Sequence, residues 1–331
     1  MADMKTCLIT RREVERVFGM KDAVECVERA FHLYGEGQAE MPPKVYLTFE
    51  KGDLRCMPVY MPTLKMAGVK NVNVHPGNRD MPTVMALISL VDPETGFPLA
   101  VMDGTYLTSL RTGAAGAVAA KYLAREDSKV VGCVGAGRQA QTQLEGLLIT
   151  RPGVNRVLAF DLNTDRAKSF RRWCKKIGVK DAVATSSAEE AVRQADIVVT
   201  VTPSRKPVVR DEWVRRGTHI NAIGADAPGK EELEPAILKR ARVIVDNWEQ
   251  ASHSGEINVP ISQGVITRDN VAGDIGQVVT GHVQGRTSRD DITVFDSTGL
   301  AIQDVCCAAE VLARLKPREG GPGRPRAIRF F

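Results

Sequence analysis

The chain has 331 residues, of which 43% are hydrophobic and 26% are charged. This composition is ordinary for a globular protein, and the length exceeds that of a usual single hydrophobic core, so two domains are expected. The formal net charge of +5 comes from 45 basic and 40 acidic residues spread along the chain. Such a distribution gives no indication of a nucleic-acid-binding surface.

The spacing of cysteine and histidine excludes several other kinds of site. Seven cysteines form no C-x-x-C pair and stand mostly among apolar residues, which favours free thiols in a reducing compartment. The five histidines lack metal-ligand spacing, so no metal site is expected. Residues 1–10 lack a secretion-signal pattern and no run of ~18 apolar residues occurs, so we expect a cytoplasmic protein with no membrane segment.

The first third of the chain predicts helices followed by a set of strands. Thr10 and Glu13 match a capping box that begins a short helix, and apolar residues recur at helical spacing over 21–34. An Ala- and Leu-rich helix is expected at 105–123. Short β-branched and apolar runs separated by turn residues predict strands at 45–49, 54–59, 68–74, 84–91 and 99–102.

Basic residues interrupt this strand-rich region. Lys44, Arg55 and Lys70 lie within or beside strand-like runs. Lysine and arginine are rarely buried without a partner, so each of the three either faces water or points inward toward a carboxylate. Arg111, near the start of the expected helix at 105–123, could reach an anion or could lie on the helix surface.

A turn of small residues follows the apolar run at 130–134. Gly135, Gly137 and Ala140 are succeeded by a helical pattern, which indicates a buried strand, a tight turn and a helix. Gly135 would permit the turn, and Gly137 would let a pyrophosphate approach the backbone. The helix that follows would direct its free N–H groups at the phosphates. The alternative is a purely structural strand-to-helix turn.

Asp161 ends the next expected strand, at 157–160. Its distance from the glycine turn, about 20 residues, is the spacing at which a carboxylate accepts both ribose hydroxyls of an adenosine. A 2′-phosphate would be repelled there, so NAD is favoured over NADP, although the nearby Arg166 softens that preference. The alternative role for Asp161 is a helix cap or turn residue.

From residue 157 onward strands and helices alternate, which predicts a parallel sheet covered on both faces. Ligands of such sheets lie beyond the carboxyl ends of the strands, and two expected ends are 200–204 and 221–226. Asp226 should therefore lie on a loop at the cofactor edge, or else cap a helix beginning near Glu231. A strand at 292–296 and an apolar helix at 301–315 follow. The Arg-, Gly- and Pro-rich segment 316–329 is expected to be a loosely ordered terminus.

Several ordered motifs resemble the ornithine cyclodeaminase/μ-crystallin family. They are the segments 41–47, 69–78, 96–103, 109–116, 224–230 and 295–301. The resemblance covers nearly the whole chain and fails only in about the last fifteen residues. Within the family, segments 202–209 and 255–259 are most similar to the archaeal-type NAD-dependent alanine dehydrogenases.

The resemblance implies an α/β protein in two parts. A Rossmann domain with a doubly wound parallel sheet, residues 119–299, would be inserted in a discontinuous α+β domain, residues 1–118 and 300–331. The discontinuous domain would bind substrate and form a homodimer.

The family likeness also implies positions for the two ligands. Lys44, Arg55, Lys70 and Arg111 would turn inward toward an amino acid or the cofactor phosphates, and Asp226 would face the reacting carbon. The residues that would bind NAD are Arg111, Thr112, Gly135, Ala136, Gly137, Arg138, Gln139, Asp161, Thr202, Pro203, Ser204, Gly224, Ser297, Thr298 and Gly299.

Arg55 departs from part of the family. Cyclodeaminases that resemble this sequence carry an acidic residue at this position, suited to activating water or handling the substrate amine. A cation at residue 55 suits a second contact with a carboxylate, which puts ornithine cyclisation in doubt.

The resemblance implies, as the leading hypothesis, reversible oxidation of L-alanine to pyruvate and ammonium. Arg55 with Lys44 or Arg111 would hold the substrate carboxylate and thereby fix Cα for hydride transfer to NAD. Lys70 and Asp226 would move protons while water attacks the iminium, and a lysine among arginines should have a lowered pKa.

Three alternatives stay open at this point. A reductase of cyclic or N-substituted imino acids would need the same carboxylate contacts and hydride, but no ammonia. A cyclodeaminase would use NAD catalytically, and a non-catalytic binding protein would keep the glycine turn while tolerating loss of the basic residues.

Overall fold

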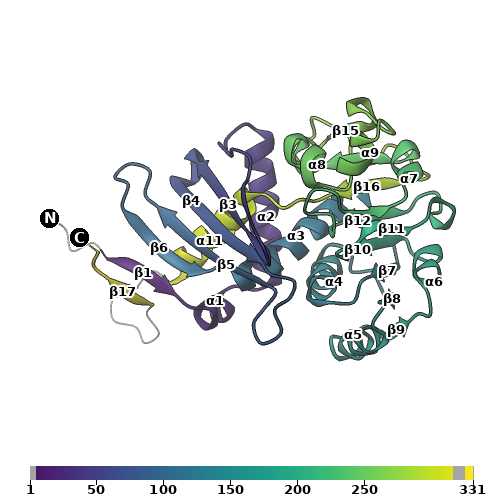
Figure 1. Cartoon of the computed structure of the whole chain (residues 1–331), viewed down its shortest axis with the longest axis horizontal. Helices are drawn as coiled ribbons and strands as arrows, with labels where there is room; N and C mark the ends of the chain where they lie inside the picture. The colour runs from purple at the N-terminus through teal and green to yellow at the C-terminus, as the bar shows by residue number, and fades with distance from the viewer. Residues whose placement is uncertain (1–4, 316–324, 331) are drawn as a thin grey trace. The chain divides into compact units, whose positions relative to one another are not determined.

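The computed structural model describes residues 5–315 and 325–330, which belong to two compact units (Figure 1). The discontinuous unit comprises Met1–Arg111 with Leu300–Phe331, and the inserted unit comprises Thr112–Gly299. The division falls inside helix α3, Thr105–Leu123, whose expected bounds are confirmed. The boundary expected at 118/119 falls in the same helix.

The discontinuous unit contains a seven-stranded sheet in the order β17-β1-β6-β5-β4-β3-β2. Strand β1 runs parallel to β6, and every other neighbouring pair is antiparallel. The strands are β1 Thr6–Ile9, β2 Val45–Phe49, β3 Gly52–Met61, β4 Met66–Val74, β5 Val84–Val91, β6 Pro98–Asp103 and β17 Arg326–Ile328. The five strands expected between residues 45 and 102 are therefore confirmed.

Helices α1 (Arg11–Val17), α2 (Met20–Gly35) and α11 (Ala301–Leu315) belong to the same unit. The expected capping box begins α1, because the Thr10 backbone N–H donates to Glu13 Oε2 at 2.7 Å. Helix α11 packs on β3, β4 and β5 and against α2 (Figure 1). The last helix of the chain thus covers the sheet formed by its first hundred residues.

The opposite face of this sheet is apolar and exposed. Leu87 of β5 pairs with Asn71 of β4, Asn71 pairs with Cys56 of β3, and Cys56 pairs with Val45 of β2. Paired residues point to the same face of a sheet, so these four side chains share one face. Leu87 is 58% exposed and Val45 is 55% exposed, while Leu47, Phe49 and Tyr60 on the same face are also exposed. An exposed apolar sheet face of this kind marks an interaction surface.

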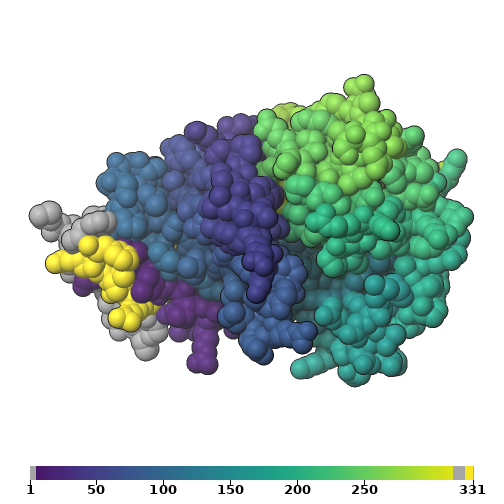
Figure 2. All heavy atoms as spheres, viewed as in Figure 1, coloured from purple at the N-terminus to yellow at the C-terminus, as the bar shows by residue number. Residues whose placement is uncertain are grey.

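Two features of this unit escaped the sequence analysis. Strand β1 was not expected, and β17 pairs with it in antiparallel register, Cys7 opposite Ala327. Figure 2 shows these C-terminal residues in yellow beside the N-terminal ones in purple. The expectation of a loosely ordered terminus is therefore wrong for 326–328, and residues 316–324 lie outside the described part.

The inserted unit contains an eight-stranded sheet in the order β15-β14-β16-β12-β10-β7-β8-β9, parallel at every pairing. Strand β7 lies between β8 and β10, and the chain passes to β8 and β9 on one side of it before β10 forms on the other. Its strands are β7 Val130–Val134, β8 Arg156–Phe160, β9 Asp181–Ala184, β10 Ile197–Thr200, β12 His219–Ala222, β14 Arg242–Val245, β15 Val271–Asp274 and β16 Thr293–Asp296. This doubly wound arrangement confirms the expected fold class.

Helices connect these strands, and a small parallel pair, β11 Arg205–Val209 and β13 Glu231–Leu233, lies outside the main sheet. The helices are α4 Arg138–Thr150, α5 Thr164–Lys176, α6 Ala188–Arg193, α7 Pro235–Arg240, α8 Trp248–Ser254, α9 Asn258–Ser262 and α10 Ile275–Val279. Short 3₁₀ turns lie at Asp211–Trp213 and Arg268–Asn270 in this unit, and at Pro62–Leu64 in the discontinuous unit. The helix expected near Glu231 is wrong: this residue begins β13, so Asp226 does not cap a helix there.

Two separate hydrophobic clusters cover the two faces of the parallel sheet. Alternate residues of one strand enter different clusters, since Val198 belongs to one and Val199 to the other. Burial on both faces explains why these strands read as continuous apolar runs in the sequence.

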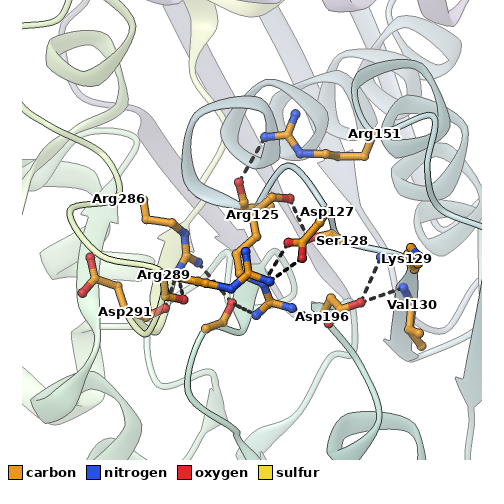
Figure 3. A network of polar contacts seen from close by, with 12 residues as sticks. Arg125, Asp127, Ser128, Lys129, Val130, Arg151, Asp196, Arg286, Arg289 and Asp291 are labelled. Carbon is orange, nitrogen blue, oxygen red and sulfur yellow. Dashed lines mark hydrogen bonds and ion pairs between the residues drawn. The ribbon is translucent and has the colours of Figure 1, made fainter.

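Arginines and aspartates join the amino ends of the parallel strands (Figure 3). Asp196 accepts the backbone N–H groups of Lys129 and Val130 at 2.9 and 3.0 Å and also binds Arg125 at 2.6 Å. Arg286 donates to the carbonyl of Leu123 at 2.7 Å, while Arg151 donates to that of Lys121 at 2.8 Å. These arginines satisfy orphan carbonyls at the C-terminus of α3 and complement its dipole.

Among the residues that the structure describes, no helix has the length and apolarity needed to cross a bilayer. Within the same ranges, no group of three or more His, Cys, Asp and Glu side chains is arranged to hold a metal ion.

Candidate active site

Lys70 is fully buried in the discontinuous unit. It lies on β4 opposite Met57 of β3 and Ile88 of β5, on the sheet face that α11 covers. Its Nζ donates to Oδ2 of Asp304, from α11, at 2.6 Å, and the Asp304 side chain is also fully buried. The inward alternative is therefore correct for Lys70, and its carboxylate partner comes from 234 residues further along the chain.

Arg111 shares the same carboxylate. Its Nε donates to Oδ1 of Asp304 at 2.9 Å, and its Nη1 donates to Oε1 of Gln303 at 3.0 Å. With both oxygens of Asp304 engaged by cations, the cluster contains two positive groups and one negative group. The structure thus excludes the helix-surface alternative for Arg111, which is buried.

Arg55 and Lys44 are the other two basic residues of this unit that were expected to face inward. Arg55 is buried, lies opposite Val72 on the face shared with Lys70, and donates from Nε and Nη2 to the Asp53 carboxylate, both at 3.1 Å. The Tyr46 ring packs against its guanidinium, 5.6 Å from the ring centre. Lys44 is half-buried and acts electrostatically on Lys70. The four basic residues therefore gather within one unit.

The pKa of Lys70 is lowered to about 7. Burial is the largest cause, and the positive charge of Arg111 adds to it, while Asp304 opposes both through its charge and hydrogen bond. An amine with a pKa near neutrality can accept a proton at physiological pH.

Asp304 and Gln303 were missed by the sequence analysis. A signal was present, because both are polar residues inside the apolar helix 301–315. Both side chains are fully buried on α11, where an unpaired carboxylate would be costly. The sequence alone could not name their partners, since Lys70 and Arg111 are about 190 to 230 residues away along the chain.

The glycine turn of the inserted unit follows β7 at the carboxyl edge of the parallel sheet. Gly135 has φ +97°, and a Cβ there would lie 2.8 Å from the Val201 carbonyl oxygen after β10. Gly137 precedes α4, whose N-terminus has no side-chain cap, and a Cβ there would meet open space. The turn therefore exposes the start of α4 between β7 and β10, where the strand order reverses.

Asp161 lies beside this turn, directly after β8. Its Oδ2 accepts the backbone N–H of Ala136 at 2.9 Å, and its Oδ1 accepts that of Asn163 at 2.8 Å. Asn163, rather than Asp161, caps helix α5. The carboxylate is half-buried and ties the end of β8 to the glycine turn.

Glu232 joins two further expected cofactor segments. Its Oε1 accepts the backbone N–H of Thr202, after β10, at 2.6 Å, and its Oε2 accepts that of Gly224, after β12, at 2.8 Å. Ser204 lies next to Thr202 and donates its backbone N–H to the Thr202 hydroxyl at 3.3 Å. Glu232 was not expected as a site residue.

Two more buried acidic residues, Glu256 and Asp296, continue the set of hydrogen bonds that begins at Glu232. Glu256 Oε1 accepts the backbone N–H groups of Glu232 and Leu233 at 2.8 and 2.6 Å, and Asp296 Oδ1 accepts that of Glu256 at 2.8 Å. Burial and the charge of Glu232 raise the pKa of Glu256 well above its ordinary value. Asp296 therefore fixes the backbone at Glu256, and Glu256 fixes the backbone at Glu232 and Leu233.

The loop after β16 is held in the same way. Asp246, after β14, is fully buried and accepts the backbone N–H groups of Thr298 and Gly299, both at 2.7 Å, together with the Thr298 hydroxyl at 2.9 Å. Gly299 has φ +79°, which favours glycine. Ser297 to Gly299 are therefore placed at the same carboxyl edge as Gly135, Thr202 and Gly224.

Asp226 lies on the loop that follows Gly224. It is half-buried and receives a 2.5 Å ion pair from Lys230 Nζ. Lys230 was part of a matching segment but was not expected as a site residue. The loop 224–230 is fixed at one end by Glu232 and near the other by Asn258, which accepts the Gly229 N–H at 2.9 Å.

The remaining expected residues differ in their exposure. Arg138 is exposed and contacts Gln141, while Gln139 accepts the Thr142 hydroxyl. Pro203 is exposed, and Thr112 is buried with its carbonyl accepting Gln143 Nε2 at 2.8 Å.

The inserted unit has the features of a dinucleotide-binding domain. An uncapped helix N-terminus, a turn without side-chain obstruction and an acidic residue after the second strand together fit a dinucleotide. The discontinuous unit adds a cluster of buried basic residues, which suits an acidic small molecule.

Comparison with known proteins places these features in a family. The family model for the ornithine cyclodeaminase/mu-crystallin family matches residues 4–319. An alanine dehydrogenase from Archaeoglobus fulgidus is 56% identical over 330 residues, covering 99% of both chains. The chain therefore belongs to the ornithine cyclodeaminase/mu-crystallin family, as its motifs indicated.

Solved structures agree with this membership. An archaeal alanine dehydrogenase dimer with bound NAD is 53% identical, with a TM-score of 0.94 over 99% of this chain and 100% of that one. A Δ¹-pyrroline-2-carboxylate reductase from Thermococcus litoralis, in complex with NADH and L-proline, is 38% identical with a TM-score of 0.90, covering 93% and 97% of the two chains.

The lowered pKa of Lys70 predicts a specific pH dependence of stability. Above about pH 7 the folded chain holds Lys70 neutral, whereas the unfolded chain keeps it protonated up to its ordinary pKa of 10.5. The unfolded state then binds more protons, so this group makes the folded state more stable as pH rises from 7 toward 10.5. The gain is about 1.4 kcal/mol per pH unit.

Lys70→Met should remove this contribution. We expect the free energy of unfolding of the unsubstituted chain, relative to that of the variant, to rise between pH 7 and pH 9. Urea denaturation at several pH values measures both. Parallel pH profiles for the two proteins would contradict the lowered pKa.

Proposed function

We propose that the protein is an NAD-dependent alanine dehydrogenase, which oxidises L-alanine to pyruvate and ammonium reversibly. The observation that carries the proposal is the buried cluster of Lys70, Arg111 and Asp304 in the discontinuous unit. The 56% identity to the Archaeoglobus fulgidus alanine dehydrogenase across the full chain supports the substrate. Bound NAD, when present, accepts the hydride from the substrate Cα.

The inserted unit would hold the cofactor at the carboxyl edge of its sheet. The N–H groups at the start of α4 and the open space beside Gly137 suit the pyrophosphate. The loops fixed by Glu232 and Asp246 present Thr202, Gly224 and Thr298 at the same edge. Because those loops are tied by buried carboxyl groups, they lose little freedom on binding.

The substrate carboxylate would bind to basic groups of the discontinuous unit. Arg55 is held by Asp53 and Tyr46, so its planar guanidinium has a defined orientation for a bidentate contact. Lys44 or Arg111 would supply the second contact. Fixing the carboxylate fixes Cα, which lowers the entropy cost of hydride transfer.

Lys70 would handle the protons of the reaction. An ammonium group has three donor hydrogens, one of which the bond to Asp304 uses. With its pKa lowered to about 7, the amine can take a proton from the water that attacks the substrate iminium. Arg111 keeps Asp304 paired when Lys70 is neutral, so the carboxylate does not become isolated.

Asp226 is the second proposed proton carrier. It is partly exposed and lies on a loop whose ends are fixed, and Lys230 pairs with it. A carboxylate at this position would accept a proton from the attacking water.

A reductase of cyclic imino acids is the second candidate. The reductase from Thermococcus litoralis, solved with L-proline, has the same fold at 38% identity. It would use the same carboxylate contacts. Arg55 argues against a third candidate, a cyclodeaminase, because a cation there does not activate water.

Substrate-dependent NADH formation tests the proposed function. We expect L-alanine and NAD to give NADH, and pyruvate with ammonium to oxidise NADH faster than Δ¹-pyrroline-2-carboxylate does. Lys70→Ala and Asp226→Asn should each lower kcat by about 10²- to 10⁴-fold, the usual contribution of general acid–base catalysis.

Lys206→Ala is a matched control, since this exposed lysine lies outside the proposed site. Faster turnover of the cyclic imine would favour the reductase. Undiminished alanine turnover in both Lys70→Ala and Asp226→Asn would remove these residues from the chemistry.

We propose that Asp161 selects NAD over NADP by accepting the ribose hydroxyls. Its carboxylate is already placed beside the glycine turn. Asp161→Ser should lower the NAD-over-NADP ratio of kcat/KM by about 10- to 100-fold, because charge-assisted hydrogen bonds are lost and a repulsive charge is removed.

Asp165→Ser is the control for that experiment. Asp165 lies four residues further on, and its side chain is 88% exposed. If Asp165→Ser changed cofactor preference as much as Asp161→Ser, selection would depend on overall charge rather than on Asp161.

We also propose that the exposed apolar sheet face pairs two copies of the chain. The related archaeal alanine dehydrogenase is a dimer, and Leu87, Val45, Leu47 and Phe49 are exposed on this face.

Sedimentation velocity should give a dimer for the unsubstituted chain and a shift toward monomer for Leu87→Asp. Leu162→Asp, at a 94% exposed position in the inserted unit, should leave the dimer intact. A monomeric unsubstituted chain would exclude the pairing.

The free cysteines favour a reducing compartment, and we propose that the protein functions in the cytoplasm. All seven are free, and five are buried. Free thiols are typical of proteins that mature in a reducing environment.

A further inference from the structure

A surface groove lies between α2, α11 and the start of β4 in the discontinuous unit. Its volume is about 230 Å³, and its lining includes Cys26, Arg29, Met66, Cys306 and Glu310. None of these residues belongs to the cation cluster or to the carboxyl edge of the parallel sheet.

Three thiols meet at the base of this groove. Cys26 comes from α2, and the adjacent Cys306 and Cys307 come from α11. The Cys26 sulfur is within hydrogen-bonding reach of both partner thiols. Cys26 and Cys306 line the groove, whereas Cys307 is completely buried.

Hydrogen bonds within the thiol cluster favour a thiolate at Cys26. Hydrogen bonds with Cys306 and Cys307 lower the pKa of Cys26, with a smaller contribution from Arg314, while burial and Glu310 oppose them. Burial instead raises the pKa of Cys174 to about 12 and that of Cys133 further. Thiolate character and access govern thiol reactivity. Cys26 is 9% exposed and lines the groove, whereas Cys133 and Cys174 of the inserted unit are completely buried.

We propose that Cys26 and Cys306 are a modification site for small hydroperoxides, at which oxidation forms a reversible disulfide between α2 and α11. With hydrogen peroxide, the Cys26 sulfur attacks one oxygen, the O–O bond breaks, and Cys26 becomes a sulfenic acid while water is released. The Cys306 sulfur then attacks the Cys26 sulfur, the S–S bond forms, and a second water leaves. Two thiols are oxidised, and one hydrogen peroxide is reduced to two waters.

The position of the pair gives the disulfide two consequences. Cys306 lies two residues after Asp304 on α11, so the bond would join the helix that holds Lys70 and Arg111 to α2. It would also close a loop of about 280 residues, and loops of that length restrict the unfolded chain strongly. Oxidation should therefore raise the melting temperature.

Peptide mapping after peroxide treatment tests the proposal. The folded full-length chain is treated with hydrogen peroxide, then alkylated in denaturant so that all remaining thiols react, digested and analysed by mass spectrometry. We expect the number of alkylated thiols to fall from seven to five and the Cys26 peptide to be joined to the Cys306–Cys307 peptide. Dithiothreitol should reverse both changes, and the oxidised chain should melt at a higher temperature.

Cysteine variants identify the partners. Cys26→Ser and Cys306→Ser should abolish the bridge and the rise in melting temperature, whereas Cys307→Ser and the matched control Cys133→Ser should retain both. The proposal fails if Cys26 stays alkylatable after oxidation, if Cys306→Ser forms the bridge as fast as the unsubstituted chain, or if only the half-buried Cys7 and Cys56 react. NAD-dependent activity is not needed for any of these readouts.

Discussion

One buried carboxylate organises the discontinuous unit. Asp304 holds Lys70 at 2.6 Å and Arg111 at 2.9 Å, and all three side chains are buried. Removing one partner of such a group leaves an uncompensated charge, which typically costs about 3–5 kcal/mol. The last helix of the chain therefore has to return to the sheet made by the first hundred residues. The charge requirement and the apolar packing of α11 act in the same direction, and together they explain why this unit is discontinuous in sequence.

The inserted unit uses charged groups differently at its two edges. At the amino ends of the strands, Arg286 and Arg151 donate to carbonyl groups that end α3. At the carboxyl ends, acids such as Glu232 and Asp246 accept backbone N–H groups from the loops. Loops without regular secondary structure must satisfy their buried backbone groups in this way. The acids at the carboxyl edge therefore give fixed shapes to the loops that a cofactor would contact.

Local sequence patterns predicted much of the fold, but they could not predict which residues far apart in the sequence pair with each other. The glycine turn at Gly135 and most strands of both units followed from periodicity and turn residues, because these depend on near neighbours, whereas β11, β13 and β15 were not predicted. Strand β1 has only four residues, and its pairing with β17 joins the two ends of the chain, so no local signal specified it. Asp304 and Glu232 escaped for a similar reason: a polar residue in an apolar segment indicates burial, but its partner depends on the tertiary fold.

The arrangement around Lys70 keeps a buried carboxylate paired and also leaves the lysine able to lose its proton near neutral pH. A buried lysine without a carboxylate would be neutral at all physiological pH values, and one with a dedicated carboxylate would stay charged. Here Asp304 is shared with Arg111, so its charge is already balanced and it favours the ammonium form less than an exclusive partner would. Burial and Arg111 then lower the pKa of Lys70 to about 7. Sharing one acid between two bases thus keeps the proton of Lys70 exchangeable near neutrality while Asp304 remains paired whether Lys70 is charged or not.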